Sequence, residues 1–315
     1  MERSTAATRL SNYLLHLSKL NPSKTYKLGL GALVFDIGQL VKFKLSLMVV
    51  FSSLACYLVF GGENFNSFHF FLLLSGGLFI TFSANAINQV LERDYDKLMV
   101  RTRLRPLADN RMSVSVALLI AGIFSILGAI SLALISPLCA TLGMISLVLY
   151  AFVYTPLKRY STLAIPVGAI PGALPALVAG VAAQQTISLE GFCLFGIQYL
   201  WQFPHFWAIA WLGHQDYKQA GFKLIRDEDG MPDRSYGLYS AFYALAGILL
   251  ILPLFVSHYL SPYLFFTITL VMIVYAYFSY LLYKKNDRQS ARMLMFCSII
   301  YLPVILSLFI LNNHL

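Results

Sequence analysis

The sequence is poor in charge and in cysteine, and both shortages narrow what the protein can be. Only 12% of its 315 residues are charged, whereas 58% are hydrophobic. A soluble domain of this length needs more polar surface than this composition supplies, so a soluble protein is excluded. The four cysteines stand apart, at positions 56, 139, 193 and 297. Because no two of them form a C-x-x-C pair, they are expected to be packing residues rather than a metal or redox centre.

The hydrophobic residues are gathered into long stretches. A membrane-spanning helix needs roughly 20 apolar residues, and about nine such stretches lie near 45–61, 68–91, 113–132, 134–153, 163–183, 190–212, 237–257, 261–283 and 294–312. Only a helix satisfies its own backbone over such lengths in lipid. The sequence therefore predicts an all-α, polytopic membrane protein with about nine transmembrane helices. Residues 1–40 are expected to form an N-terminal cytoplasmic arm, and residues 41–315 a single membrane domain.

Acidic residues are scarce, and basic residues are absent from half of the connections. All 23 Lys and Arg lie before residue 45 or in the connections after the second, fourth, sixth and eighth stretches. The opposite connections hold only Glu63 and Glu190. By the positive-inside rule the N-terminus is cytoplasmic, and an odd number of spans places Leu315 on the opposite side. This placement associates the excess of positive charge with a lipid bilayer and not with nucleic acid.

The fifth stretch is unusual because it contains three prolines, Pro166, Pro171 and Pro175. A proline in a membrane helix leaves a backbone carbonyl without its donor, so another group must satisfy it. Two interpretations stay open for this stretch. It is either a kinked and tightly packed helix, or a kink that opens a cavity for a large ligand.

Three oxygen-bearing side chains recur at the inner end of the second stretch. Asn88, Glu92 and Asp96 stand at i, i+4 and i+8, so a helix stacks them along one face. Such residues at the edge of a membrane are costly without a function. Hard oxygen ligands suit Mg²⁺, which completes its shell with water and substrate phosphate. Arg101 and Arg105 follow directly and suit phosphate oxygens. The pattern predicts a diphosphate site, whereas a solvated helix end would explain the arginines but not the acidic column.

These motifs resemble those of the intramembrane aromatic prenyltransferases, the UbiA-type family. The resemblance rests on N-x-x-x-E-R-x-x-D followed by R-T-x-x-R-P-L, and on YTPLKR at 154–159. A third segment, QFPHFWAIAWLGHQDYKQAG at 202–221, resembles the haem O synthase branch of that family. The resemblance spans roughly Lys42 to Arg226, and it implies a nine-helix bundle that binds prenyl diphosphate through magnesium at the cytoplasmic face.

The resemblance also implies roles for individual residues. The expected magnesium ligands are Asn88, Glu92 and Asp96, with Asp216 as an anchor for a second ion. The expected diphosphate-binding residues are Arg101, Arg105, Lys158 and Arg159, and Lys158 joins the three column residues as catalytic. The candidates for contact with haem, as iron ligand, propionate partner or packing residue, are His205, His214, Trp207 and Tyr154.

The chain departs from the family pattern at two places. The benzoate-prenylating enzymes carry a second D-x-x-x-D cluster where this chain has only Asp216, which suits the haem branch. That branch carries Lys-Pro-Arg at the start of its first helix, where this chain has Lys42, Phe43 and Lys44. The role of this segment is therefore left open.

The expected reaction is farnesyl transfer from farnesyl diphosphate to the 2-vinyl group of haem B, which gives haem O and pyrophosphate. Haem A synthase or terminal-oxidase assembly factors are expected partners, in a bacterial inner membrane or, as the alternative, a mitochondrial one. Three other functions stay open: a prenyltransferase with a quinone-type acceptor, a haem or small-molecule transporter, and a structural assembly factor. A transporter should place ionisable residues near the middle of the bilayer, where this chain has few.

Overall fold

The computed structural model describes residues 29–62 and 65–312. Contacts divide the chain into two units, Met1–Phe35 and Asp36–Leu315. Helix α2 (Leu30–Leu40) begins in the first unit and ends in the second. The predicted arm lies largely outside the described residues, and its predicted boundary at residue 40 stays a prediction.

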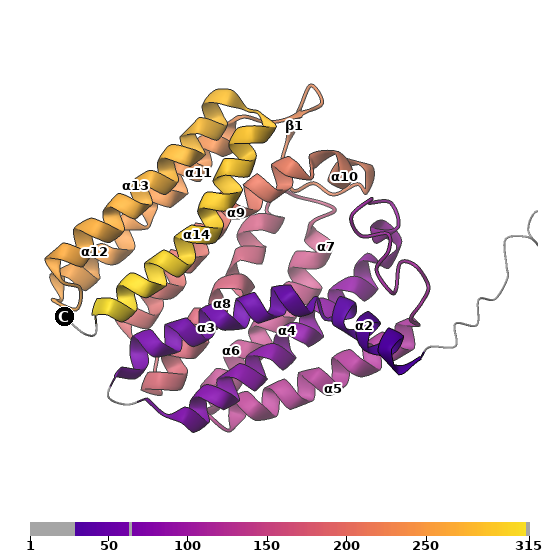
Figure 1. Cartoon of the computed structure of the whole chain (residues 1–315), viewed down its shortest axis with the longest axis horizontal. Helices are drawn as coiled ribbons and strands as arrows, with labels where there is room; N and C mark the ends of the chain where they lie inside the picture. Colours follow the sequence, from indigo (N-terminus) through magenta and orange to yellow (C-terminus); the bar gives the residue numbers. More distant parts are fainter. Residues whose placement is uncertain (1–28, 63–64, 313–315) are drawn as a thin grey trace, which may run out of the picture. The chain divides into compact units, whose positions relative to one another are not determined.

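The second unit is almost entirely helical (Figure 1). Its helices after α2 are α3 (Phe43–Gly61), α4 (Ser67–Asp96), α5 (Val114–Ala133), α6 (Pro137–Val148), η2 (Leu149–Tyr154), α7 (Thr155–Leu157), α8 (Ala164–Gln184), α9 (Leu189–Leu212), α10 (His214–Gln219), α11 (Ser235–Ala246), α12 (Ile248–Val256), α13 (Pro262–Lys285) and α14 (Arg288–Asn312). Two short antiparallel strands, β1 (Asp227–Glu228) and β2 (Met231–Pro232), form a hairpin between α10 and α11.

The helices confirm the predicted fold class. Among the described residues, eight helical segments are long and apolar enough to cross a membrane, with α6–η2–α7 and α11–α12 each counted as one continuous segment. The remaining predicted span, 190–212, is the 24-residue helix α9. It is long enough to cross but less apolar, because Gln198, Gln202 and His205 interrupt it. About nine membrane helices are therefore present, as the sequence predicted.

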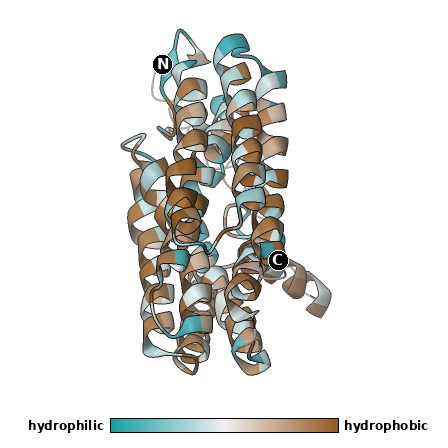
Figure 2. Ribbon diagram, turned by 90° about the vertical axis from the view of Figure 1, so that its left-hand side faces the viewer, coloured by the Kyte–Doolittle hydropathy of each residue, from teal (hydrophilic) through white to brown (hydrophobic). Residues whose placement is uncertain are grey.

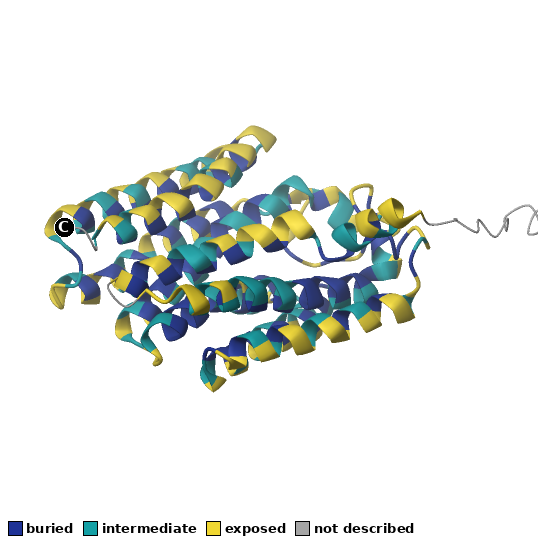
Figure 3. Cartoon of the chain, turned by 60° about the horizontal axis from the view of Figure 1, so that its bottom comes forward, coloured by how far each residue is buried: buried dark blue, intermediate teal, exposed yellow. Residues whose placement is uncertain are grey.

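The surface of the helices is apolar, as a bilayer requires. Large hydrophobic side chains are exposed on several helices, for example Phe51 on α3, Ile126 on α5 and Phe266 on α13. Figure 2 shows hydrophobic residues along the lengths of the helices and hydrophilic ones mainly at their ends. Figure 3 shows exposed residues recurring along the outward sides of the helices. In water such a surface would aggregate, whereas in lipid it is solvated.

Helix α8 carries the prolines of the fifth stretch and is the most buried span, with 72% of it inside the structure. Pro175 has no N–H, so the carbonyl of Pro171 loses the donor that a regular helix would supply. The Ser146 hydroxyl on the neighbouring α6 segment donates to that carbonyl at 3.0 Å. The Ser53 hydroxyl on α3 donates to the carbonyl of Pro175 at 2.8 Å. The proline-rich helix is thus held by hydroxyl groups from two neighbours.

A π-helical turn, η2, interrupts the fourth span immediately before Thr155 and Lys158. Such turns insert an extra residue into the helix, shift the register of the residues downstream, and are frequent at functional sites. The Thr155 hydroxyl donates to the carbonyl of Tyr150 at 2.9 Å across this turn. The turn therefore sets the direction in which Thr155 and Lys158 leave the membrane helix.

Helices α11 and α13 approach each other at Gly237. A Cβ atom at this position would lie 2.2 Å from the backbone nitrogen of Tyr283, so the two backbones would have to separate. We expect Gly237→Ala to destabilise the protein by about 1–3 kcal/mol, the usual effect of overpacking. The measurement is thermal unfolding of the purified protein in detergent.

The matched control is Gly122→Ala on α5, where a Cβ would have nothing within 4 Å. This change should leave the midpoint temperature of unfolding unchanged or raise it slightly. An equal fall in both variants would contradict the close approach of α11 and α13.

Candidate active site

The acidic column predicted from the sequence lies on one continuous helix. Helix α4 runs to Asp96, five residues beyond the predicted end of its span, so Asn88, Glu92 and Asp96 all belong to it. All three side chains are buried, with exposed fractions of 0%, 4% and 1%. Burial of a carboxylate costs several kcal/mol of hydration free energy, which a nearby cation and hydrogen bonds must offset. In this structure both carboxylates of the column have such partners.

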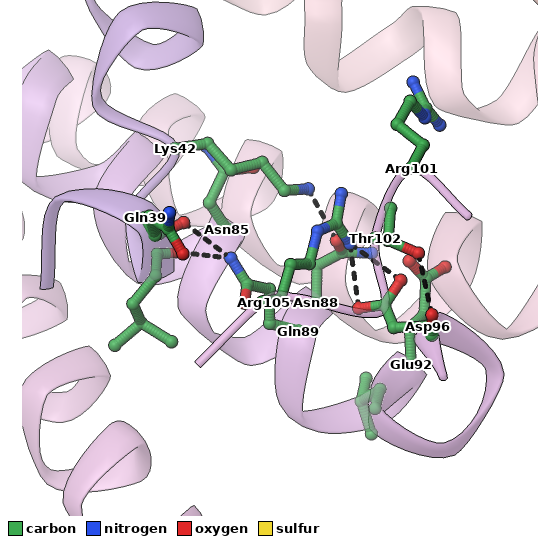
Figure 4. Close-up of polar contacts among 12 residues, drawn as sticks. Gln39, Lys42, Asn85, Asn88, Gln89, Glu92, Asp96, Arg101, Thr102 and Arg105 are labelled. Atoms are coloured by element: carbon green, nitrogen blue, oxygen red, sulfur yellow. Dashed lines mark hydrogen bonds and ion pairs between the residues drawn. The ribbon is translucent and has the colours of Figure 1, made fainter. Parts of the chain in front are cut away.

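The two carboxylates are each paired with a basic side chain. The Arg105 guanidinium donates to both oxygens of Asp96, at 2.9 and 2.8 Å (Figure 4). The Lys158 ammonium forms an ion pair with Glu92, and only 8% of Lys158 is exposed. Arg105 belongs to the connection after α4, and Lys158 follows the π-helical turn. Residues from two inner connections therefore meet at one helix end.

Asn88 links the column to a third basic residue. Its amide oxygen accepts a hydrogen bond from the Lys42 ammonium at 2.7 Å, and its amide nitrogen donates to the Thr155 hydroxyl at 3.0 Å. Three basic groups thus surround two carboxylates. The cluster carries an excess of positive charge, which suits an anion of several negative charges.

Lys42 reaches the column because of the backbone between α2 and α3. It adopts a left-handed conformation, with φ 48° and ψ 53°, which is uncommon for a residue other than glycine. Asn85 and Gln89 stabilise this break by donating their side-chain amides to the carbonyls of residues 39–41, at 2.7–3.4 Å. These carbonyls lie at the end of α2, where a helix leaves carbonyls without a regular intrahelical donor. The Ser46 hydroxyl also donates to the carbonyl of Val41, at 2.7 Å. The strained residue is therefore held by two amides from the helix that carries the column.

The environment of the column also affects the charge of Lys42. Desolvation lowers the pKa of Lys42 to about 7, and repulsion from the Arg105 guanidinium adds to this effect. The carboxylate of Glu92 acts in the opposite direction but does not outweigh them. A positive charge on Lys42 is therefore costly until an anion binds beside it, which would raise its pKa again.

The connection 97–112 is fastened to the membrane domain at both of its ends. The Thr102 hydroxyl donates to the carbonyl of Asp96 at 3.0 Å. Arg111 forms an ion pair with the buried Asp36 of α2 and donates to the carbonyl of Leu104 at 2.7 Å. Arg105, which lies between these two attachments, is therefore held over the column.

Two aromatic rings also lie close to the Lys158 ammonium. The ammonium lies 4.8 Å from the ring centroid of Tyr154 and 5.4 Å from that of Phe222. Phe222 in turn packs against Tyr95, with ring centroids 5.7 Å apart. Such rings stabilise a cation through their faces while excluding water.

Two of the predicted diphosphate residues make other contacts. The Arg159 guanidinium donates to the carbonyl of Leu91 at 2.7 Å and stacks on Tyr95, 3.9 Å from the ring centroid. Arg101 is exposed, donates to the Tyr217 hydroxyl at 2.9 Å, and points away from the column in Figure 4. Their predicted role in binding diphosphate stays a prediction.

The predicted second anchor, Asp216, is half-buried on α10. Within the described part of the chain, no hydrogen bond or ion pair joins its carboxylate to the column. The neighbouring His214 is buried and bonded through Nε2 to Asp227 at 2.9 Å. Lys218, which donates to the same carboxylate at 2.8 Å, and His214 hold the pKa of Asp227 below its usual range.

The other haem candidates lie on or against α9 and η2. Trp207 is buried among Phe203, Tyr236 and Tyr243, with ring centroids 5.2–5.6 Å away. Tyr154 packs against Gly168 of α8, where a Cβ would lie 2.5 Å from its ring. His205 is half-buried and its Nδ1 lies 2.7 Å from the hydroxyl of Ser298 on α14. No observation tests their contact with haem, which stays a prediction.

The column fits magnesium as a shared ligand set and not as a closed cage. Among the described residues, no group of three or more His, Cys, Asp and Glu side chains could hold a metal ion by itself. Glu92 and Asp96 offer two carboxylates, and Asn88 offers an amide oxygen. Mg²⁺ in phosphate-transfer sites is typically bound by one or two carboxylates, with substrate phosphate and water filling the shell. The donor set therefore fits magnesium when a diphosphate is present.

Comparison with known sequences gives the family. The sequence pattern of the UbiA prenyltransferase family matches residues 49–300. The chain belongs to this family. It is 37% identical over 310 residues to "Protoheme IX farnesyltransferase" of Christiangramia forsetii, a match that covers 97% of this chain and 99% of that protein. It is 39% identical to the protein of the same name from Cytophaga hutchinsonii, covering 87% of this chain and 96% of that one.

The chain is also similar to a human mitochondrial protein and to solved structures. The human mitochondrial "Protoheme IX farnesyltransferase" is 34% identical, over 86% of this chain and 61% of its own length. Among solved structures, a UbiA homologue from Archaeoglobus fulgidus bound to GPP and Mg²⁺ has a TM-score of 0.61 at 15% identity, over 87% of this chain and 99% of that one. A digeranylgeranylglyceryl phosphate synthase has a TM-score of 0.74, also at 15% identity, over 89% of this chain and 98% of that one. These two likenesses show that the UbiA-family fold is shared.

The pairing of Arg111 with Asp36 gives a test of how the connection 97–112 is held. Removing one partner of a buried pair leaves an uncompensated charge, so Arg111→Ala should lower stability by about 3–5 kcal/mol. The double variant Asp36→Asn, Arg111→Ala should regain part of that loss, because no charge is then left unpaired. The measurement is chemical unfolding in detergent. Asp109, the exposed partner of Arg111, gives the control Asp109→Asn, which should change little; a double variant no more stable than Arg111→Ala would contradict the pairing.

Proposed function

We propose that this family member transfers a farnesyl group from farnesyl diphosphate to the vinyl group of haem B, forming haem O and pyrophosphate. The family supplies the class of reaction, and the near full-length identity to farnesyltransferases of protohaem supports both substrates. The observation that carries the proposal is the buried column of Asn88, Glu92 and Asp96 surrounded by three basic side chains. Such a cluster is suited to a diphosphate and has no evident task in a purely structural protein.

The first step is departure of the diphosphate. The bond between C1 of the farnesyl group and the diphosphate oxygen breaks, and its electron pair leaves with the diphosphate. Lys158, Lys42 and Arg105 are held in place before the reaction, so they stabilise the developing negative charge without reorganising. Lys158 in particular is held by its ion pair with Glu92 and by contacts with the rings of Tyr154 and Phe222. Arg101 and Arg159 are expected to add positive charge at the same membrane face.

Magnesium completes this arrangement. When bound, Mg²⁺ neutralises phosphate oxygens and so makes the diphosphate a better leaving group. Asn88, Glu92 and Asp96 would hold it, and Asp216 is proposed to anchor a second ion.

The second step forms the carbon–carbon bond. The terminal vinyl carbon of haem B attacks C1 of the allylic cation, which leaves positive charge on the carbon next to the porphyrin ring. Water adds to that carbon and loses a proton, giving the hydroxyl group of haem O. The apolar side chains of the spans shield the allylic cation from water until the vinyl group has reacted.

The charge distribution supports an orientation for the chain. The column and its basic partners lie at the ends of helices that adjoin the Lys- and Arg-rich connections, so we place this face and the N-terminus in the cytoplasm. Leu315 is then on the opposite side. The bacterial relatives favour a bacterial inner membrane. Haem A synthase or terminal-oxidase assembly factors are the proposed partners.

The test of the reaction is product mass. Purified protein is incubated with haem B, farnesyl diphosphate and Mg²⁺, and the pigment is analysed by mass spectrometry. We expect a product heavier by one farnesyl group and one hydroxyl group. Consumption of a quinone-type acceptor in place of haem B, or binding of both substrates without any gain in mass, would overturn the proposal.

The same assay tests whether turnover depends on the residues of the column and not on nearby exposed charges. Asp96→Asn keeps the shape of the side chain but removes its charge, and should abolish turnover with little loss of folded protein. The matched control is Asp94→Asn on the same helix, because Asp94 is exposed and pairs with Arg93 and Lys97 outside the column. Its turnover should stay within about twofold of the wild type, since exposed pairs contribute little. Turnover by purified Asp96→Asn would contradict the metal role of the column.

A further inference from the structure

Helix α9 presents different polar and aromatic groups to three of its neighbours, α8, α11 and α14. Gln202 donates to the carbonyl of Ala169 on α8 at 3.0 Å, and Trp207 packs against the tyrosines of α11. The third side faces α14, and its side chains are Trp201 and His205. An ionisable residue within a membrane span is a candidate for function by default. His205 lies seven residues from the inner end of α9, which is ~10 Å along the helix axis.

The hydrogen bonds of Ser298 on α14 determine which ring nitrogen of His205 carries its proton. The Ser298 hydroxyl lies 2.5 Å from the carbonyl oxygen of Met295. Because a carbonyl only accepts, the single hydroxyl proton must lie between these two oxygens. The Ser298 oxygen is then an acceptor towards His205, whose Nδ1 lies 2.7 Å away. The network therefore assigns the proton of the neutral ring to Nδ1.

This assignment leaves Nε2 of His205 with a lone pair. Within the described part of the chain, Nε2 makes no hydrogen bond, and no acidic side chain contacts the ring. The imidazole is also fixed in orientation, because it stacks on Trp201 with ring centroids 5.1 Å apart and an interplanar angle of 19°. Trp201 is itself anchored, since its indole N–H donates to the carbonyl of Ser298 at 2.7 Å and its own carbonyl accepts from Tyr275 at 3.0 Å.

A neutral, oriented imidazole with one nitrogen hydrogen-bonded and the other free is the arrangement of a metal ligand. Metal-binding histidines almost always donate their second ring N–H to an oxygen, which fixes the tautomer and raises the basicity of the ligating nitrogen. Ser298 occupies the position of that oxygen. Most buried polar atoms in folded proteins have a hydrogen-bond partner, and Nε2 of His205 has none among the described residues.

The other described histidines do not share this arrangement. His214 is bonded through Nε2 to Asp227, and lies at the start of α10 and not within a span. His69 and His258 lie in or beside the outer connections, at the start of α4 and after α12. Among the described histidines, His205 alone lies within a membrane span with one ring nitrogen hydrogen-bonded and the other free.

We infer that Nε2 of His205 binds the iron of haem B and that Ser298 acts as its positioning residue. The identity of the ligand rests on the proposed function, since haem B is the iron-bearing substrate of that reaction. Coordination would fix the position of the porphyrin relative to α9.

The experiment measures iron coordination without farnesyl diphosphate. Full-length protein is purified, loaded with haem B, and examined by resonance Raman spectroscopy in the ferrous state. We expect an iron–histidine band in the wild type that is lost in His205→Ala, and that returns as an iron–imidazole band when imidazole is added. His69→Ala is the matched control and should keep the band. Retention of the band in His205→Ala, or its absence from the wild type, would overturn the inference.

Two further variants test the part played by Ser298. Ser298→Ala removes the acceptor of the Nδ1 proton and keeps the histidine, so haem affinity should fall at least about tenfold and the iron–histidine frequency should drop. Ser298→Thr keeps the hydroxyl and should retain the wild-type frequency. A purely structural role would leave the frequency unchanged in Ser298→Ala. These variants also decide the question if His205→Ala does not fold.

The proposed reaction and the proposed binding of iron by His205 can be refuted independently of each other. Product mass, measured on the same wild-type preparation, reports the proposed function alone. If the wild-type protein converts haem B but shows no iron–histidine band, the proposed iron binding by His205 is wrong and the proposed reaction stands. If the wild-type protein shows the band but forms no product, the proposed reaction is wrong and the proposed iron binding by His205 stands.

Discussion

Burial of two carboxylates at the end of α4 is the constraint on which the site depends. Glu92 and Asp96 are nearly inaccessible, and a buried carboxylate is tolerated only beside a cation. Arg105 and Lys158 supply that cation from two different connections, and Lys42 arrives from the break between α2 and α3. The pairing therefore draws distant parts of the chain together. It also leaves the cluster with more positive than negative charge, and this excess suits it to diphosphate.

The sequence predicted the column because helical spacing alone places Asn88, Glu92 and Asp96 on one face. It also identified Arg105 and Lys158, which lie near the column in the chain or within a recognised motif. The fold class followed from the number of apolar stretches, even though α9 is too polar to resemble the others. The prolines of α8 led to the expectation that other groups satisfy the freed carbonyls, and the Ser146 hydroxyl does so at Pro171.

The features that the sequence could not predict depend on contacts between distant segments. The sequence left the role of Lys42 open, because its approach to Asn88 requires a left-handed backbone that spacing along the chain does not predict. The signals were its place in the Lys42-Phe43-Lys44 segment and a pair of amides, Asn85 and Gln89, beside the column on α4. Arg159 has the charge for a diphosphate but donates to the backbone of α4. The tautomer of His205 depends on a serine 93 residues away, which spacing along the chain cannot reveal.

The central claim is that the excess of positive charge around the column binds diphosphate. The most direct measurement is the affinity for farnesyl thiodiphosphate, an unreactive analogue, by calorimetry with Mg²⁺ present. The account predicts that Lys158→Met weakens binding by at least about tenfold, since a charge-assisted hydrogen bond is worth about 1.5–3 kcal/mol. Lys97→Met, which removes an exposed lysine paired with Asp94, should bind like the wild type. Equal affinity in Lys158→Met and the wild type would contradict the account.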